Sequence, residues 1–366
     1  MKIVDVRATA VSVPLLHEFK AAYGTRSTAD FVIIEIEDDQ GRIGLGEASC
    51  IPIYDEGSQA GVVFVINKYF KPLLIGRDPR NITQIMENLA AAVKGERYAK
   101  CAVDFALHDL VGKIYDMPVY DLLGGKAREV QVCWVLSAKD PVQVNREAKE
   151  KLAEGYRTFK LKVGTDARKD LENVEALRDA IGYDTSLRLD GNEAWEPKEA
   201  LRRITEFAKF IPNHVEQPVP AWNINGLRFV REHSPIPVVA DECILTPYDT
   251  MEIARADAAD MVNIKVSRVG GIVAARKIAA IAEAAGQFPF AGSMLELGPG
   301  TVASAHFVAA NAALSLTSEL VGPLLLKRDI LKKPLEYKSG CLILPEGAGF
   351  GIELDQDAVA EFTVKV

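Results

Sequence analysis

The strongest constraint on the fold is a regular interval between polar residues that end short apolar segments. Successive members of this series are separated by 28, 26, 25 and 24 residues, and they are Lys162, Asp190, Glu216, Asp241 and Lys265. A β-strand, a loop and a helix of about three turns use roughly that many residues, so one βα unit recurs along the chain.

Eight apolar segments are expected to form parallel strands, at 132–138, 158–164, 186–192, 213–218, 237–242, 261–267, 289–295 and 314–320. Amphipathic segments lie between them, as in the helical spacing of Leu171, Val174, Leu177 and Ile181. About eight such units close a barrel, so we expect an α/β fold with a modified TIM-type (β/α)7β barrel. An open doubly wound sheet is the alternative, but no Gly-rich phosphate loop follows a first strand.

The two ends of the chain have a different pattern. Residues 3–13, 31–37 and 42–47 alternate like strands, and a DDQG turn at 38–41 joins the last two into a hairpin. We therefore divide the chain into three regions. These are an N-terminal α+β capping domain (1–125), a barrel catalytic domain (126–325) and a C-terminal tail (326–366) that returns to the capping domain.

Composition restricts the partners. The 366-residue chain has a net charge of −8, which disfavours nucleic acid as a partner. No apolar run approaches the ~20 residues of a membrane span, and the N-terminus has no signal-peptide pattern. The five cysteines are scattered and form no CxxC pair, so we expect free thiols and a cytoplasmic location.

Three carboxylates end three successive predicted strands: Asp190, Glu216 and Asp241. One such residue alone is more often a turn former or a helix cap. Neighbouring strands are about 4.8 Å apart, so the three side chains should converge. Three unpaired carboxylates cannot all stay ionised without a strong cation, and oxygen-only ligands favour Mg²⁺ (or Mn²⁺) over zinc.

Lysines flank these carboxylates. Lys160 and Lys162 alternate around Leu161 and should point into the barrel, about 7 Å apart along the strand. Like-charge repulsion would lower their pKa values and allow a lysine to act as a base. Lys265 should lie across the carboxylates as a second proton-transfer group. A solvated edge strand is the alternative, but the surrounding residues are apolar.

The order of these motifs resembles the enolase superfamily, and within it the muconate lactonizing enzymes. The motifs are KLK at 160–162, DGN at 190–192, EQP at 216–218, ADE at 240–242 and NIK at 263–265, followed by RVGG at 268–271. The resemblance covers nearly the whole chain.

The resemblance implies a small carboxylate substrate as the partner, and it implies roles for individual residues. Asp190, Glu216 and Asp241 would bind the metal ion, and Lys162 and Lys265 would be the acid/base pair. Lys160 would assist electrostatically. Asn192 and Glu242 would support the metal ligands. Glu296 would line the site, and its alternative role is a carboxylate at a helix N-terminus.

Two absences narrow the branch of the family. No histidine ends the seventh predicted strand, which disfavours the mandelate-racemising and sugar-acid-dehydrating relatives, and His306 is expected to be structural. Dipeptide epimerases carry Asp-x-Asp at the eighth strand, where this chain has Thr317-Ser-Glu319.

Substrate specificity is expected from loops of the capping domain, at 17–27 and 51–57. The candidate substrate-binding residues are Lys20, Tyr23, Arg26, Tyr54, Glu296 and Glu319. The alternative is that the loop residues among them are ordinary solvent-exposed residues.

The motifs leave four candidate functions to weigh. The leading one is a muconate-type cycloisomerase, which forms a lactone through an enolate. The others are a racemase or epimerase of an N-acylated amino acid, a dehydratase of the o-succinylbenzoate synthase type, and a non-catalytic metal-binding homologue. The last would have lost a lysine or a carboxylate, and all are present. A homo-oligomer is expected.

Overall fold

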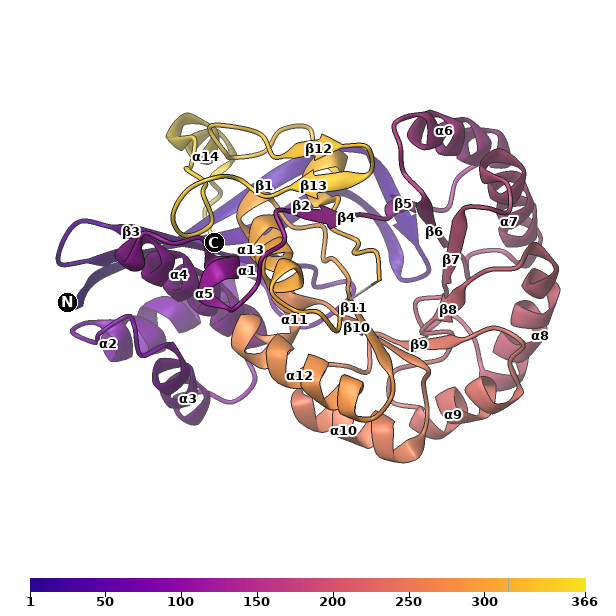
Figure 1. Ribbon diagram of the computed structural model, residues 1–366, viewed down its shortest axis with the longest axis horizontal. Coiled ribbons are helices and arrows are strands. Elements are labelled where there is room, and N and C mark those ends of the chain that lie inside the picture. Colours follow the sequence, from indigo (N-terminus) through magenta and orange to yellow (C-terminus); the bar gives the residue numbers. More distant parts are fainter. Residues whose placement is uncertain (315) are drawn as a thin grey trace.

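The structure, a computed structural model, describes residues 1–314 and 316–366. Figure 1 shows an N-terminal domain beside a larger domain in which strands and helices alternate. The N-terminal sheet is antiparallel, in the order β1 (Ile3–Ala21), β2 (Gly24–Asp38) and β3 (Ile43–Cys50). The Asp38 carboxylate accepts hydrogen bonds from the backbone N–H groups of Gln40 and Arg42, both at 2.9 Å. The hairpin predicted around the DDQG turn is therefore confirmed.

Helices cover this sheet. They are α1 (Gln59–Val65), η1 (Ile66–Phe70), α2 (Lys71–Leu74), α3 (Ile82–Ala92), α4 (Arg97–Tyr115) and α5 (Val119–Leu122). The long helix α4 packs on β2 and β3. The helix can approach β3 closely because Gly44 and Gly46 have no side chains. A Cβ atom at either position would collide with the α4 backbone.

The larger domain is built on a seven-stranded parallel sheet in the order β11-β10-β9-β8-β7-β6-β5. Its strands are β5 (Trp134–Leu136), β6 (Thr158–Lys162), β7 (Ser186–Asp190), β8 (His214–Glu216), β9 (Val238–Ala240), β10 (Met261–Ile264) and β11 (Phe288–Ala291). The connecting helices are α6 (Pro141–Ala153), α7 (Ala167–Ile181), α8 (Pro197–Phe207), η2 (Ala208–Phe210), α9 (Ile224–His233), α10 (Pro247–Ala256), α11 (Val266–Val269) and α12 (Ile272–Ala284). The first seven predicted strands are confirmed.

The eighth predicted strand, 314–320, includes residue 315, which lies outside the described residues. Within the rest of that segment, the Ser318 N–H donates to Gln131 O (2.9 Å) and the Ser318 carbonyl accepts from Cys133 N–H (2.7 Å). The Glu319 N–H donates to Ala291 O of β11 at 2.9 Å. The segment therefore hydrogen-bonds to the chain just before β5 and to β11, at the two edges of the sheet.

The C-terminal segment returns to the N-terminal domain. After α13 (Gly298–Ala309) and η3 (Gly322–Leu325), strands β12 (Glu336–Lys338) and β13 (Cys341–Ile343) form a three-stranded sheet with β4 (Glu129–Gln131), in the order β12-β13-β4. The last helix, α14 (Gln356–Phe362), lies beside β1 (Figure 1). The Val364 N–H donates to Ala10 O (3.0 Å), and the Phe350 N–H donates to the Asp109 carboxylate (2.7 Å).

The prediction that residues 17–27 form a loop was wrong. They belong to an extension of the β1–β2 hairpin, with Lys20 opposite Thr25 and an irregular register between Pro14 and Phe19. The irregularity interrupts the alternation of apolar side chains, so the pairing beyond it is not visible in the sequence. The hairpin tip, which carries Tyr23, reaches the end of the parallel sheet.

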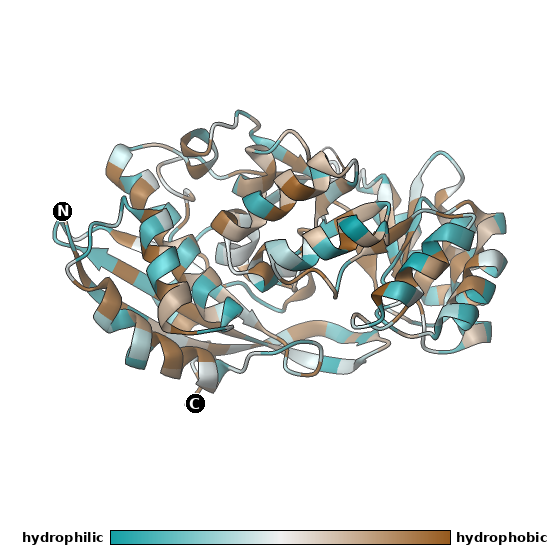
Figure 2. Cartoon of the chain, turned by 90° about the horizontal axis from the view of Figure 1, so that it is seen from below, coloured by the Kyte–Doolittle hydropathy of each residue, from teal (hydrophilic) through white to brown (hydrophobic). Residues whose placement is uncertain are grey.

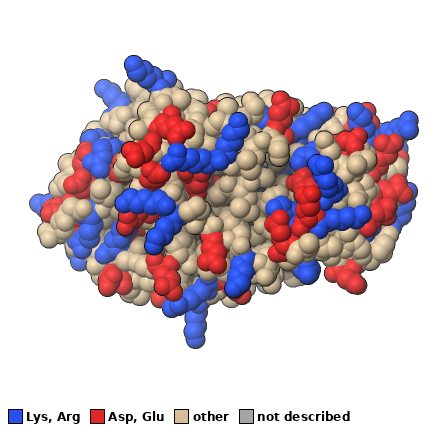
Figure 3. Space-filling view, turned by 90° about the horizontal axis from the view of Figure 1, so that it is seen from above, with Lys and Arg blue, Asp and Glu red and all other residues tan. Residues whose placement is uncertain are grey.

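The surface is that of a polar globular chain. Figure 2 shows hydrophilic and hydrophobic residues alternating along the helices, as amphipathic packing requires. Basic and acidic residues are interspersed on the face drawn in Figure 3. All five cysteines are free thiols, as predicted. No helix in the described part of the chain is both long and apolar enough to span a membrane.

Asp109 is the buried carboxylate that joins the tail to the N-terminal domain. It accepts from Leu45 N–H (2.8 Å), Phe350 N–H (2.7 Å) and Lys113 Nζ (2.7 Å). Asp109→Ala would leave these buried donors unpaired, so we expect a loss of about 3 kcal/mol or more in the free energy of unfolding. Urea denaturation measures it. The exposed control Asp121→Ala should be neutral, and equal stability of the two variants would contradict the prediction.

Candidate active site

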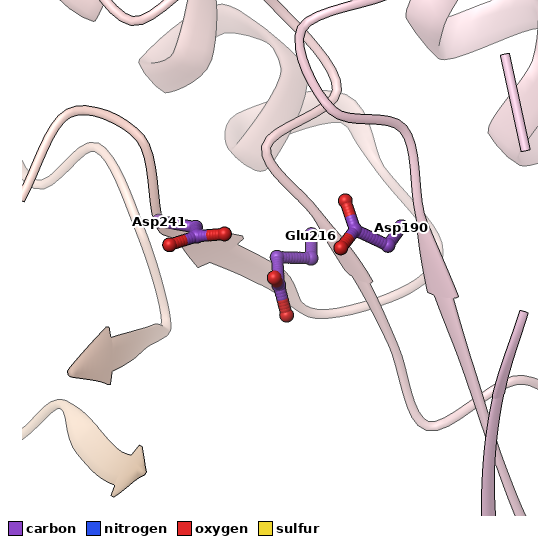
Figure 4. Close-up of side chains that lie close together, drawn as sticks. All are labelled: Asp190, Glu216 and Asp241. Carbon is purple, nitrogen blue, oxygen red and sulfur yellow. The ribbon is translucent and has the colours of Figure 1, made fainter. Parts of the chain in front are cut away.

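Three carboxylates meet at the ends of neighbouring strands. Asp190 and Glu216 are the last residues of β7 and β8 and are paired in register, and Asp241 directly follows β9. All three are fully buried, and one oxygen from each lies within 4.8 Å of the others. Figure 4 shows Glu216 between the other two carboxylates. The predicted convergence is thus present in the structure.

The carboxylate trio fits a hard divalent ion. Its donors are all oxygens, and Glu216 Oε2 is buried without a hydrogen-bond partner among the described residues. Ligands on opposite sides of Mg²⁺ are about 4.2 Å apart, so a shift of a few tenths of an ångström would bring the three onto one ion. Burial, followed by the charge of Asp190, raises the pKa of Glu216 well above its usual range. A bound cation would remove this conflict between the carboxylates.

Lysines lie at both ends of the trio. Lys162 Nζ is 2.6 Å from Asp190 Oδ2, and Lys265 Nζ is 2.6 Å from Asp241 Oδ2. Lys160 is more deeply placed, and its Nζ contacts Asp190 (2.8 Å), Glu216 (2.7 Å) and Glu319 (2.9 Å). Lys162 and Lys265 thus face the trio from opposite ends.

The prediction that the pKa values of Lys160 and Lys162 are lowered was wrong. Burial lowers the pKa of Lys162, but the negative charge of Asp190 outweighs it and the pKa is raised. Burial also opposes the charged form of Lys160, yet Asp190 and Glu216 raise its pKa well above the usual range. The two lysines repel each other, but each contacts the Asp190 carboxylate, and for Lys162 that attraction outweighs the repulsion.

Asn192 and Glu242 support the ligands from behind. The Asn192 backbone N–H donates to Asp190 Oδ1 (2.9 Å), and its side-chain amide donates to Glu242 Oε1 (2.7 Å). Burial and the charge of Asp241 raise the pKa of Glu242 to about 8. These contacts match the supporting positions that the family resemblance implies.

Arg268 is a site residue whose role sequence reasoning missed. It is 1% exposed, and its guanidinium pairs with the Asp241 carboxylate (2.5 Å) and donates to Tyr54 Oη (2.9 Å). Tyr54 Oη also accepts from Lys265 Nζ at 2.6 Å. The RVGG motif marked this residue, but only the turn of α11 after Lys265 brings it back to the trio.

A small cavity lies above the trio, with a volume of about 30 Å³, close to that of one water molecule. Its lining is mostly apolar and aromatic, and its polar members include Lys162, Lys265 and Glu319. The rings of Tyr23 and Tyr54 lie 4.7 Å apart and belong to this lining. The hairpin tip and the 51–57 loop therefore both reach the cavity.

The remaining candidates are dispersed. Glu319 contacts Lys160 and lines the cavity. Glu296 is fully buried and accepts from Ser267 Oγ (2.9 Å) and Met294 N–H (2.9 Å), and it is not among the residues that line the cavity.

Lys20 and Arg26 stand outside the cavity. Lys20 is exposed on the hairpin and lines a separate cleft beside α6. Arg26 Nη1 is buried without a partner among the described residues, and burial lowers the pKa of this arginine. Neither residue is among those that line the cavity above the trio.

His306 is structural, as predicted. Its Nδ1 accepts from the Tyr120 N–H (3.0 Å), and its ring stacks on that of Tyr120 at 5.4 Å. Burial lowers its pKa to about 3, so it remains neutral.

Comparison with known proteins agrees with this geometry. Residues 3–124 match the family "Mandelate racemase / muconate lactonizing enzyme, N-terminal domain", and residues 143–358 match "Enolase C-terminal domain-like". The chain is 35% identical to L-Ala-D/L-Glu epimerase of Clostridium acetobutylicum, over 96% of this chain and 99% of that protein. It is 34% identical to N-succinyl-L-Arg/Lys racemase of Bacillus cereus, over 100% and 98%.

A solved structure has nearly the same fold. It is the muconate lactonizing enzyme from Pseudomonas fluorescens complexed with muconolactone, with a TM-score of 0.96 and 35% identity over 99% of each chain. Relatives of three activities are therefore equally similar, so identity does not separate the activities. The chain belongs to the enolase superfamily, as an isomerase of the muconate lactonizing enzyme subgroup.

Proposed function

We propose that this enzyme is a muconate-type cycloisomerase. The observation that carries the proposal is the placement of Lys162 and Lys265 at opposite ends of a carboxylate trio, below a mainly apolar and aromatic cavity. Such a site suits a small unsaturated dicarboxylate. Because the cavity volume is only about 30 Å³, we expect the lining, to which the hairpin tip and the 51–57 loop belong, to move when substrate enters.

Asp190, Glu216 and Asp241 would hold Mg²⁺ or Mn²⁺, whose charge would stabilise an enolate next to the substrate carboxylate. In lactone formation, the distal carboxylate forms a C–O bond to one alkene carbon, and the alkene electron pair moves toward the other carboxylate. Lys162 Nζ then donates a proton to the α-carbon. Lys265, held by Asp241 and Tyr54, faces the opposite side. Lys160 offsets the charge of Glu216 and Glu319.

The same parts fit a second candidate, a racemase of N-acylated amino acids. One lysine would remove the α-proton and the other would return a proton to the opposite face. The identity to the N-succinyl-L-Arg/Lys racemase supports this candidate. A dehydratase of the o-succinylbenzoate synthase type would also use this pair. Dipeptide epimerisation is disfavoured because Thr317 replaces the first carboxylate of Asp-x-Asp and Glu319 already pairs with Lys160.

We also infer that the seven-stranded sheet and the segment at 316–319 together form the modified (β/α)7β barrel. The hydrogen bonds from this segment to both edges of the sheet support closure. A cytoplasmic location and a homo-oligomeric assembly remain proposals, the former supported by the five free thiols.

Removing a lysine tests the proton transfer. Lys162→Ala should lower kcat by about 10³-fold, because general acid catalysis contributes roughly 10² to 10⁴. The fall in ultraviolet absorbance of cis,cis-muconate measures cycloisomerisation, and the change in optical rotation of N-succinyl amino acids measures racemisation. Lys169→Ala, on the exposed face of α7, should have no effect. If Lys162→Ala retained full activity toward the substrate that the wild type turns over, the proton-transfer role of Lys162 would be contradicted.

Removing a ligand tests the metal site. Glu216→Gln deletes the charge of the central carboxylate, so Mg²⁺ affinity measured by calorimetry should fall at least about tenfold. The exposed control Glu175→Gln should bind Mg²⁺ like the wild type. A chelator should abolish turnover, and added Mg²⁺ or Mn²⁺ should restore it. Unchanged Mg²⁺ affinity in Glu216→Gln would show that the ion is held elsewhere.

A further inference from the structure

A second, cationic groove lies between the N-terminal domain and α12, outside the active site. Its volume is about 690 Å³, within the range of small-molecule sites. It is lined by the start of α3, one face of α4, α5 and the first turns of α12. Its cationic lining residues are Arg80, His108, Arg276 and Lys277, and no acidic residue of the described chain lines it.

His108 is the buried polar group of this groove, at 4% exposure. Its Nδ1 lies 2.8 Å from the Asp104 carbonyl oxygen, which can only accept, so Nδ1 carries the hydrogen. The other ring nitrogen, Nε2, has no hydrogen-bond partner in the described chain, and the His108 side chain belongs to the lining of the groove. Burial lowers the pKa of His108, but the Asp104 carboxylate 3.3 Å away outweighs it and the pKa is raised. When His108 is protonated, its Nε2 carries a second N–H, which then needs an acceptor.

The start of α3 supplies further donors. This 11-residue helix has no side-chain cap at Asn81. The backbone N–H groups of its first three residues, Ile82, Thr83 and Gln84, have no acceptor among the described residues, and all three residues line the groove. Free N–H groups at a helix N-terminus favour an anion.

The charges around the groove are only partly neutralised. Arg80 pairs with Asp78 at 2.5 Å. Arg276 and Lys277 are exposed and form no ion pair within the described chain. An anion in the groove would therefore meet at least two uncompensated cations besides His108.

We propose that this groove binds a phosphate group, free or as a phosphate monoester, through His108, Arg276, Lys277 and the start of α3. The site also joins the two domains, because Asp104 accepts from the N–H of Ile272, the first residue of α12, at 2.6 Å. A ligand held by α3, α4 and α12 would stabilise this junction. The proposal does not depend on which reaction the active site performs.

Calorimetric titration of the Mg²⁺-loaded enzyme with inorganic phosphate, and separately with AMP, tests the site at constant ionic strength. The double variant Arg276→Glu/Lys277→Glu should weaken binding by about tenfold or more, since charge-assisted hydrogen bonds are lost. Lys68→Glu, which reverses an exposed charge outside the groove, should bind like the wild type. Tighter binding of AMP would identify a monoester as the occupant, and tighter binding of inorganic phosphate would identify free phosphate.

A second readout does not require a variant. Phosphate should shift the ¹⁵N resonance of His108 Nε2, which stands apart from the active-site lysines. The proposal would be overturned if no phosphate binding were detected, or if the double variant bound phosphate as tightly as the wild type. It would also be overturned if Lys68→Glu weakened binding as much as the double variant does, or if phosphate left the His108 resonance unmoved.

Discussion

The structure depends on a buried array of charges at the carboxyl ends of the parallel strands. The register of β6, β7 and β8 sets Lys162 beside Asp190 and Asp190 beside Glu216. Four cations meet five carboxylates there, with Lys160, Lys162, Lys265 and Arg268 facing Asp190, Glu216, Asp241, Glu242 and Glu319. Burial and the neighbouring carboxylates raise the pKa values of Glu216 and Glu242, which disfavours their charged forms. A further cation at the trio would favour the charged forms, so the same array of charges accounts for a metal site at this place.

The array also explains why the N-terminal domain has to cover the sheet. Tyr54 comes from the 51–57 loop, and its hydroxyl joins Lys265 to Arg268. Arg97 of α4 donates to the Arg268 carbonyl oxygen at 3.1 Å. Residues of the capping domain thus complete the hydrogen bonds of the charged centre, so movement of this loop changes the surroundings of Lys265.

Much of the parallel sheet and of the charged centre could be predicted from the sequence, because parallel strands buried on both faces have a simple sequence pattern. Short apolar segments located seven strands, and their polar last residues located the carboxylate trio and the lysines. Features that depend on contacts between distant segments could not be predicted. The hairpin at 17–27 is hidden by the irregular register after Pro14, and Arg268 reaches Asp241 only through the turn of α11. The predicted direction of the pKa shifts of Lys160 and Lys162 was wrong, because the direction depends on which carboxylates each lysine contacts.

The most direct test of the account is proton exchange at the reacting carbon. The Mg²⁺-loaded enzyme is incubated with muconolactone in D₂O, and the protons next to the carboxylate are followed by ¹H NMR. The account predicts that deuterium replaces one of these protons stereospecifically, and that Lys162→Ala loses the exchange while keeping its fold. Absence of exchange with the wild-type enzyme, or exchange that continues unchanged in Lys162→Ala, would contradict it.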